Sequence, residues 1–516
     1  MVSAFKNESY TDFSKEDNQR KMKEALKLVS AQLGREYDII IGSERVKTAQ
    51  KLLSYNPSEK DQVVGVFQKG TPKEAEAAIQ EACQVFETWR WVDPAQRADY
   101  LFRAAEVMRR RRLELDAWMV LEEGKNWLEA DADVAEAIDF MEFYGRQMLR
   151  LSQEQPLTRI HTEKSELIYI PLGVGVVIPP WNFPLAILVG MTSASFVCGN
   201  TVVLKPSSDS PTMGVKFMEI LEEVGLPPGV VNFVTGSGAA IGDTLVGHPK
   251  TRFISFTGSK EVGLGIVELA AKTADPQIWI KRVVAEMGGK DAIIVDSQTD
   301  LERAAQGVTV SAFGFQGQKC SACSRAIVVA EVYDQILKLL KKNAESITVG
   351  PVIHQENYMG PVINQRAMDS ILQYIEIGKK EGRLLCGGSL VGGNGYFIQP
   401  TIIADVDPRA RVAQEEIFGP VLAVIKASDF DHALQIANDT EYGLTGAVYT
   451  DSGEKIERAK KVFHCGNLYI NRKCTGALVG VHPFGGFNMS GTDSKAGGRD
   501  YLLLYTQAKS ISEFVG

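Results

Sequence analysis

Val230-Val231-Asn232-Phe233-Val234-Thr235-Gly236-Ser237-Gly238-Ala239-Ala240-Ile241-Gly242 joins a strand-like run to a glycine-rich turn. The β-branched residues up to Thr235 predict a buried strand, and a helical pattern follows over 239–246. Glycines at such a junction let backbone N–H groups and a helix N-terminus approach a phosphate. The spacing is G-x-G-x-x-x-G and not the usual dinucleotide fingerprint, so an ordinary glycine-rich turn explains the stretch equally well.

Strand-like and helical runs alternate on both sides of this turn, in two series. The first series has strands at 167–180, 201–205, 230–235, 252–256 and 282–286, and helices at 184–197, 213–224, 239–246 and 261–272. The second series has strands at 291–295, 326–329, 421–426, 444–449 and 467–471, and helices at 300–312, 333–346, 365–381 and 430–438. Alternation of this kind predicts an α/β protein with two doubly wound parallel sheets.

The two ends of the chain have different patterns. Helices are expected at 18–33, 73–90, 94–122 and 128–153, with short strands at 38–41 and 63–67. A strand-like tail over 501–514 follows a glycine-rich connector, and residues 165–170 are also strand-like. We expect subunits to exchange these strands in a small β oligomerisation element, so a homodimer or a multiple of dimers is predicted.

Composition limits the partners and the location. The net charge of −8 argues against nucleic-acid and anionic-membrane partners. The basic run Arg109–Arg112 is the main contrary signal, and it lies in a helical pattern rich in acidic residues, which favours a solvated or interface face. We find no export signal and no apolar stretch long enough for a membrane helix. Seven scattered cysteines suit a reducing cytoplasm. Cys320 and Cys323 have no second Cys-x-x-Cys and the six histidines show no ligand spacing, so no metal is expected.

Residues 313–325 place two cysteines, Cys320 and Cys323, among glycine, serine and alanine. Small neighbours leave a thiol open to a ligand, and a thiolate is a strong nucleophile near neutral pH. A redox or metal-binding Cys-x-x-Cys, an inert buried thiol and a catalytic nucleophile with a bystander remain open on this pattern alone.

Several other stretches have both an ordinary and a functional interpretation. Lys205, Ser207 and Ser208 follow a strand, and Thr257, Gly258 and Ser259 follow another, where ligands bind in open α/β sheets. Asn182 lies in the rigid turn Pro179–Pro184 and could donate to an oxyanion. Glu286 ends a strand and could activate water, whereas Glu416 could contact a ribose. Surface lysines, turn asparagines and solvated carboxylates are the ordinary alternatives.

In combination these stretches resemble the aldehyde dehydrogenase superfamily, from about residue 40 to the end. The motifs are Pro-Trp-Asn-Phe-Pro at 180–184, Lys205-Pro206, Phe256–Ser259, Glu286-x-Gly288-Gly289-Lys290, Gly317-Gln318-x-Cys320 with Arg325, Glu416–Pro420 and Pro483–Gly486. The resemblance implies a dinucleotide-binding domain at 1–150 and 171–288, a catalytic domain at 289–485, and an oligomerisation element at 151–170 and 486–516.

The resemblance also implies the roles of the catalytic and cofactor residues. Cys320 is the implied nucleophile, Cys323 its neighbour, Glu286 the general base, and Asn182 with the backbone N–H of Cys320 the oxyanion hole. The implied contacts to NAD are Ile178, Pro180, Trp181, Lys205, Ser207, Ser208, Gly238, Gly242, Thr257, Gly258, Ser259, Glu416 and Phe418.

Within the superfamily the chain is most similar to the 1-pyrroline-5-carboxylate dehydrogenase group, through 315–325, 471–480, 483–487 and the helix at 133–143. This similarity implies oxidation of L-glutamate γ-semialdehyde to glutamate, in proline or arginine breakdown. The implied substrate contacts are Ser321, Gly476 and Ala477 for the carboxylate, Glu136 for the ammonium, and Phe183 and Phe487 for the aliphatic chain. A proline dehydrogenase is a candidate partner.

Three points remain open at this stage. Ser208 stands where many NAD-preferring relatives have an acid, so NAD is expected but NADP is not barred. Another semialdehyde, such as succinic or aminoadipic, is the main rival substrate. A non-catalytic, crystallin-like scaffold and a thiol-redox role for the cysteine pair are the rivals from other classes.

Overall fold

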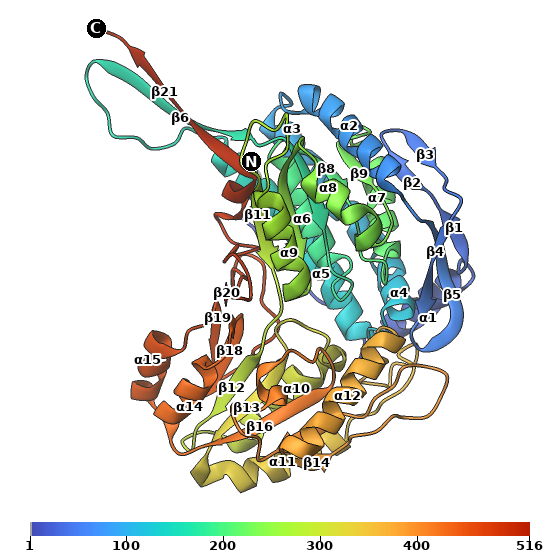
Figure 1. Ribbon diagram of the computed structural model, residues 1–516, viewed down its shortest axis with the longest axis vertical. Helices are drawn as coiled ribbons and strands as arrows, with labels where there is room; N and C mark the ends of the chain where they lie inside the picture. Colours follow the sequence, from blue (N-terminus) through green and yellow to red (C-terminus); the bar gives the residue numbers. More distant parts are fainter. Residues whose placement is uncertain (1–2) are drawn as a thin grey trace.

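The computed structural model describes residues 3–516 and has two α/β bodies, one above the other in Figure 1. The upper body is built on a seven-stranded sheet. Its order is β11 (Arg282–Glu286), β10 (Thr251–Thr257), β7 (Val174–Ile178), β8 (Thr201–Leu204), β9 (Val231–Phe233), β2 (Ile39–Ile41) and β3 (Glu44–Val46). The strands from β11 to β9 are parallel to one another, whereas β2 pairs antiparallel with both β9 and β3. Strand order reverses between β7 and β10, which is where open α/β sheets bind ligands.

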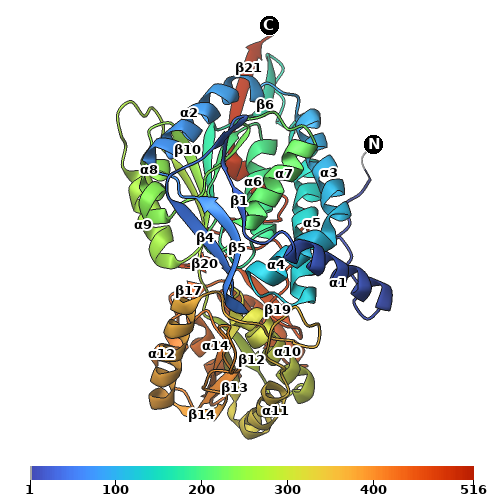
Figure 2. The same ribbon diagram turned by 90° about the vertical axis from the view of Figure 1, so that its right-hand side faces the viewer.

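Alternating apolar residues cover both faces of this sheet. Val177 and Leu204 face one helical layer, while Val176 and Val203 face the other. The first layer contains α6 (Ala186–Val197) and α7 (Thr212–Glu223), backed by α1 (Glu16–Ser30), α3 (Pro94–Arg110), α4 (Arg112–Glu122) and α5 (Trp127–Leu151). The opposite face holds α2 (Pro72–Trp89), α8 (Asp243–Gly247) and α9 (Lys260–Ala271). A three-stranded sheet of β1 (Arg35–Tyr37), β5 (Glu59–Gln68) and β4 (Lys51–Asn56) lies at the right of this body in Figure 1 and in front of it in Figure 2.

The lower body has a second seven-stranded sheet. Its order is β14 (Arg383–Cys386), β15 (Thr401–Ala404), β16 (Val421–Ala427), β13 (Cys323–Val329), β12 (Asp291–Val295), β18 (Thr445–Tyr449) and β19 (Asn467–Ile470). Only the edge strand β14 is antiparallel. One apolar core holds α10 (Leu301–Phe313) and α11 (Tyr333–Glu345); the other holds α12 (Gln365–Glu381), α13 (Arg411–Gln414), α14 (Phe430–Asn438) and α15 (Gly453–Val462).

A two-stranded arm projects from the upper body (Figures 1 and 2). It consists of β6 (Glu163–Pro171) and β21 (Thr506–Phe514), paired antiparallel over their whole lengths. The two strand-like runs therefore pair with each other within one chain. At its base Tyr505 shares a 2.8 Å hydrogen bond with Ser255 of β10. The short strands β17 (Tyr442–Gly443) and β20 (Phe487–Asn488) pair elsewhere, in the lower body's glycine-rich region.

Several expected elements differ in detail. The helix expected over 94–122 is two helices, interrupted at Arg111. The strand expected over 167–180 is two strands, because Gly173 has a φ of 144° at the break. The helix expected from 239 begins with a π-helical turn, η1 (Gly238–Gly242). The strand expected from 501 begins with a 3-10 helix, η4 (Tyr501–Tyr505).

The basic run at 109–112 is neutralised inside the chain. Each of its four arginines forms an ion pair with a carboxylate, and Arg112 reaches Asp131 at 2.6 Å. The run is therefore not a free cationic surface. Within residues 3–516, no helix is both long and apolar enough to cross a membrane.

Candidate active site

The turn that carries Cys320 has an unusual backbone. After α10, Phe315, Gln316 and Gly317 have φ angles of 49°, 57° and 67°, in the left-handed region. Non-glycine residues rarely adopt this region unless their surroundings hold them there. At Gly317 a Cβ atom would lie 2.3 Å from the carbonyl oxygen of Gly419, so only glycine fits.

The side chain of Gln316 explains how this turn is held. Its amide nitrogen donates to the carbonyl oxygens of Gly124 and Pro361, at 3.1 and 2.8 Å. Its amide oxygen accepts from the backbone N–H of Gly360 at 3.0 Å. Segments far apart in the chain thus fix the backbone just before the nucleophile.

Cys320 itself is half-buried at the end of this turn. Burial, and then the charges of Asp291, Glu416 and Glu286, raise the pKa of its thiol well above the usual value. The neutral thiol is therefore favoured in this structure, whereas the residue type alone suggests a ready thiolate. The motif Glu286–Lys290 packs against Cys320, since a Cβ on Gly289 would lie 2.5 Å from the carbonyl oxygen of Cys320.

Asn182 reaches the same turn from the upper body. Asn182 follows β7 in the proline-bounded loop and is only 3% exposed. Its Nδ2 donates to the carbonyl oxygen of Gln318 at 2.9 Å. An amide nitrogen has two N–H groups, so one remains for an oxyanion beside Cys320.

Glu286 ends β11 and faces the glycine-rich segment after β19. Ser494 Oγ donates to one carboxyl oxygen at 2.7 Å, and the backbone N–H of Gly486 approaches the other at 3.3 Å. Burial raises the pKa of Glu286 to about 8, against the opposing effect of these hydrogen bonds. A carboxyl group with this pKa can exchange a proton with water near neutral pH. Nothing in the sequence pattern singles out Ser494.

The expected cofactor residues lie along the carboxyl edge of the upper sheet. Burial lowers the pKa of Lys205 to about 8, and the only hydrogen bond of its Nζ within the described residues is to the carbonyl oxygen of Pro206. A buried ammonium without an acidic partner fits ribose hydroxyls or a phosphate. Ser208 donates to the carbonyl oxygen of Gly236 at 3.4 Å, and Ser207 accepts from the backbone N–H of Asp209.

The neighbouring loops leave room above this edge. A Cβ atom on Gly238 or Gly242 would meet no atom within 4 Å, so the space over η1 is open. Thr257 is the last residue of β10. Ser259 follows and caps α9, and the N–H of Gly258 donates to the carbonyl oxygen of Glu286. Open backbone at a strand-to-helix junction and a buried lysine together fit a dinucleotide.

Glu416 and two aromatic residues, Trp181 and Phe418, lie between this sheet edge and the lower body. The backbone N–H of Gly289 donates to Glu416 at 3.0 Å, and burial raises the pKa of this carboxyl to about 7. The ring of Trp181 packs edge-to-face on Phe418, at 5.6 Å between centroids. Ile178 ends β7, and Pro180 and Trp181 follow it in the chain, whereas Glu416 and Phe418 come from the loop before β16 of the lower body.

Glu136 is a carboxyl group without a partner. It lies on α5, and among residues 3–516 it has no ion pair and no side-chain hydrogen bond. Burial, and then the charge of Asp133, raise the pKa of Glu136 to about 8. Such a group is suited to receive an ammonium, because pairing would offset the cost of burying its charge.

The expected carboxylate site is next to the nucleophile. Cys474 Sγ contacts the carbonyl oxygen of Ser321 at 3.3 Å, so the loop that leads to Gly476 and Ala477 lies beside Ser321. Gly476 has a φ of 76° and is exposed. Phe487 packs on His464, with 5.0 Å between ring centroids, and no described contact joins it to Phe183.

Three polar features near the site were not expected from sequence. Lys319, beside Cys320, pairs with Glu129 at 2.7 Å. Cys323 is buried, and burial, followed by the neighbouring Cys474 thiol, raises the pKa of its own thiol well above the usual value. Lys125 is buried next to Phe183. Each contact joins residues far apart in the chain, so local patterns do not reveal it.

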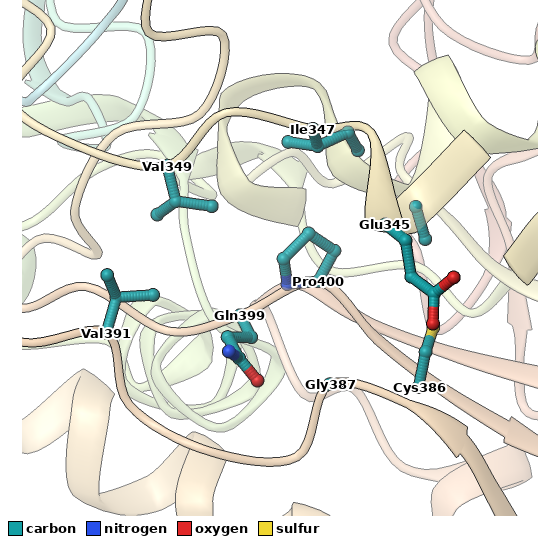
Figure 3. Close-up of a pocket in the computed structure, with 9 residues that line it drawn as sticks. Glu345, Ile347, Val349, Cys386, Gly387, Val391, Gln399 and Pro400 are labelled. Carbon is teal, nitrogen blue, oxygen red and sulfur yellow. The ribbon is translucent and has the colours of Figure 1, made fainter. Parts of the chain in front are cut away.

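A surface cavity of about 430 Å³ lies away from these residues, beside α11 and β14 (Figure 3). Glu345, Cys386 and Gln399 are among its lining residues, and none of the expected site residues lines it. Burial raises the pKa of Cys386 to about 11, so this thiol is not an activated nucleophile.

Comparison with known proteins gives a consistent result. The Aldehyde dehydrogenase family profile matches residues 45–511. The chain is 58% identical over 513 residues to a 1-pyrroline-5-carboxylate dehydrogenase of Geobacillus kaustophilus, covering 99% of this chain and 100% of the relative. A Thermus 1-pyrroline-5-carboxylate dehydrogenase solved with bound NAD is 51% identical, with a TM-score of 0.98 and complete coverage of both chains. Proline utilization A (PutA) from Bdellovibrio bacteriovorus is 46% identical with a TM-score of 0.98, covering 99% of this chain and 53% of that one. Since the family profile covers residues 45–511, which include every motif around Cys320, this chain belongs to the aldehyde dehydrogenase family.

Proposed function

We propose that this protein is an NAD-dependent dehydrogenase that oxidises L-glutamate γ-semialdehyde, the hydrolysed form of 1-pyrroline-5-carboxylate, to L-glutamate in proline catabolism. The observation that carries the proposal is the full-length similarity, at 58% identity, to a relative named 1-pyrroline-5-carboxylate dehydrogenase. The arrangement around Cys320, Asn182, Glu286 and Glu136 supports it chemically.

The first chemical step is the attack of Cys320 on the aldehyde carbon. Its thiol proton leaves as the C–S bond forms, and the half-buried position leaves a route to solvent. The carbonyl oxygen becomes an oxyanion, held by the free N–H of Asn182 and the backbone N–H of Cys320. Loss of one such donor typically costs about 10²–10³ in rate.

The second half of the reaction releases the acid. The nicotinamide of NAD, when bound, accepts a hydride from the carbon attached to Cys320, which leaves a thioester on the sulfur. Glu286 then takes a proton from water, whose oxygen attacks the thioester carbon, and the C–S bond breaks to free the carboxylic acid and the Cys320 thiolate. The proton held by Glu286 returns to this thiolate, which restores the thiol and the carboxylate. Lys205, the open backbone at Gly238 and Glu416 hold the dinucleotide.

Substrate selection follows from the charges of an amino-acid aldehyde. Glu136 pairs with the ammonium, since it lacks a partner of its own. Ser321 and the N–H groups of Gly476 and Ala477 receive the carboxylate, because a hydroxyl and exposed N–H groups suit an anion. Succinic semialdehyde has the carboxylate but no ammonium, so Glu136 is the contact that separates the two substrates.

The test is NADH formation by the purified protein on 1-pyrroline-5-carboxylate and on a panel of aldehydes that includes succinic and aminoadipic semialdehydes. We expect the highest kcat/KM for glutamate semialdehyde, and kcat/KM for NAD above that for NADP. A higher kcat/KM for succinic semialdehyde would contradict the substrate assignment, and strict NADP preference would contradict the cofactor assignment.

We also propose that the β6–β21 arm joins subunits into a homodimer or a multiple of dimers. The arm projects from the body, and an exposed sheet edge is a ready pairing surface. Deleting residues 507–516 should lower the mass measured by light scattering, and an unchanged mass would count against this role. A proline dehydrogenase as partner and a cytoplasmic location stay predictions; binding assays with a purified proline dehydrogenase and cell fractionation test them.

A further inference from the structure

Lys125 is an ammonium buried in the protein interior beside the candidate active site. Lys125 is 0% exposed, and its Nζ pairs with Asp133 at 2.7 Å. Its Nζ also lies over two aromatic rings, 4.3 Å from the centroid of Phe183 and 4.6 Å from that of Phe315. A desolvated cation over an aromatic face is strongly attracted, so this one group contacts both rings at close range.

The two rings belong to the two segments that must meet for catalysis. Phe183 directly follows Asn182, the expected oxyanion donor. Phe315 is the first of the three left-handed residues that lead to Cys320. The two segments also touch through the hydrogen bond from Asn182 to the carbonyl oxygen of Gln318.

Further hydrogen bonds join the neighbours of Lys125 to the two catalytic segments. Asp133 accepts a second hydrogen bond, from the backbone N–H of Ala186 at 2.6 Å, where α6 begins just after the Asn182 loop. The neighbouring carbonyl oxygen of Gly124 accepts from Gln316. Lys125 thus connects α5, the Asn182 loop and the Cys320 turn, and it touches none of the reacting atoms.

We propose that Lys125 is a positioning residue for catalysis. By holding Phe183 and Phe315 on one ammonium, it aligns the Asn182 amide with the Cys320 turn and maintains the left-handed backbone at Phe315. A misplacement of about 1 Å in such an arrangement can cost about 10² in rate. The inference rests on the proposed function only in requiring aldehyde oxidation, whichever aldehyde proves to be the substrate.

Lys216 is a matched control within the same chain. It is 4% exposed, pairs with Glu219 at 2.8 Å, and lies over the rings of Tyr37 and Trp118 at 5.4 and 5.0 Å. None of these partners is an expected site residue. Removing either lysine therefore disrupts a similar buried cluster, but only Lys125 is connected to the nucleophile.

The experiment compares Lys125→Met/Asp133→Asn with Lys216→Met in the full-length protein. The double substitution removes both members of the Lys125–Asp133 ion pair, and the amide oxygen introduced by Asp133→Asn can still accept from the backbone N–H of Ala186. With the aldehyde that the parent turns over fastest, we expect kcat to fall at least tenfold, by the positioning argument, while KM for NAD stays within about twofold. Lys216→Met should lower the melting temperature and leave kcat unchanged.

A double-mutant cycle with Asn182→Ala separates positioning from general damage. If Lys125 acts through Asn182, its replacement should cost much less in the Asn182→Ala background than in the parent. Fully additive losses, or equal kcat losses in the Lys125 and Lys216 variants, would overturn the proposal. If the double variant does not fold, Phe315→Leu removes the ring face from the other side and should give the same non-additivity.

A parent with no activity on any aldehyde would refute the proposed function. The Lys125 variant should then still differ from Lys216→Met by faster iodoacetamide labelling of Cys320, and equal labelling would overturn the positioning role.

Discussion

Replacing Glu286 with Gln should stop turnover while sparing the first half of the reaction. Because the pKa of Glu286 is about 8, only about a tenth of this carboxyl is ionised at pH 7, and about a hundredth at pH 6. If thioester hydrolysis requires the ionised form, kcat should rise nearly tenfold per pH unit up to about pH 7 and level off above pH 8. In Glu286→Gln the base is absent, and hydrolysis should slow by about 10²–10⁴.

The assay is a stopped-flow measurement of NADH at excess NAD and substrate. The variant should show a burst of up to one NADH per active site, followed by a very slow steady state with no rise between pH 6 and pH 8. If the burst and the steady state fell equally, Glu286 would act before the hydride leaves. That result, or a flat pH profile in the parent, would refute its assignment to water activation.

Thermal unfolding provides an independent check on the same pKa. Glu286 binds its proton more tightly in the folded protein, so its contribution to stability is complete below about pH 4.5 and is lost as pH rises through 8. The full shift corresponds to about 5 kcal/mol as an upper value. Glu286→Gln, which cannot ionise, should therefore be more stable than the parent at pH 8 and nearly equal at pH 4.5.

Three further predictions concern individual side chains. Glu136→Gln should lower kcat/KM for glutamate semialdehyde about 10- to 100-fold through loss of a charged hydrogen bond, and equal loss on succinic semialdehyde would contradict the ammonium contact. Cys320→Ala should abolish NADH formation, whereas Cys323→Ser should retain it; the reverse pattern would favour a different nucleophile. Ser208→Glu should reduce kcat/KM for NADP far more than for NAD, because a carboxylate repels a 2′-phosphate, and an unchanged ratio of the two would place Ser208 away from the ribose.

Much of the fold follows from local patterns that the structure repeats. The runs at 201–205, 252–256 and 282–286 are strands because each is apolar, short and followed by a turn residue. The sequence itself indicates the break between β6 and β7, through Pro171 and Gly173. The interruption at Arg111 has no such signal, since the sequence there is continuously helical; its guanidinium pairs with Glu219 of α7, a contact that only the tertiary structure brings about.

The candidate site likewise contains residues that the sequence identifies and residues that it does not. Cys320, Asn182 and Glu286 are identifiable because each lies in a short motif at a strand or helix end. Ser494, which donates to Glu286, and Lys125 are not identifiable, because their roles depend on contacts across 208 and 190 residues, to Glu286 and Phe315. Even the protonation of Cys320 depends on such contacts, since burial and distant carboxylates set it.

The turn at 315–317 has a consequence for how the protein acquires its reactive thiol during folding. Its left-handed backbone is held by Gln316, whose partners are at Gly124, 192 residues earlier, and at Pro361, 45 residues later. We expect contacts of such separation to form late, after both bodies have collapsed. A folding intermediate with native-like strands therefore carries Cys320 as an ordinary thiol. During refolding, helical circular dichroism should recover before enzymatic activity, because the nucleophile is assembled only when the whole chain is in place.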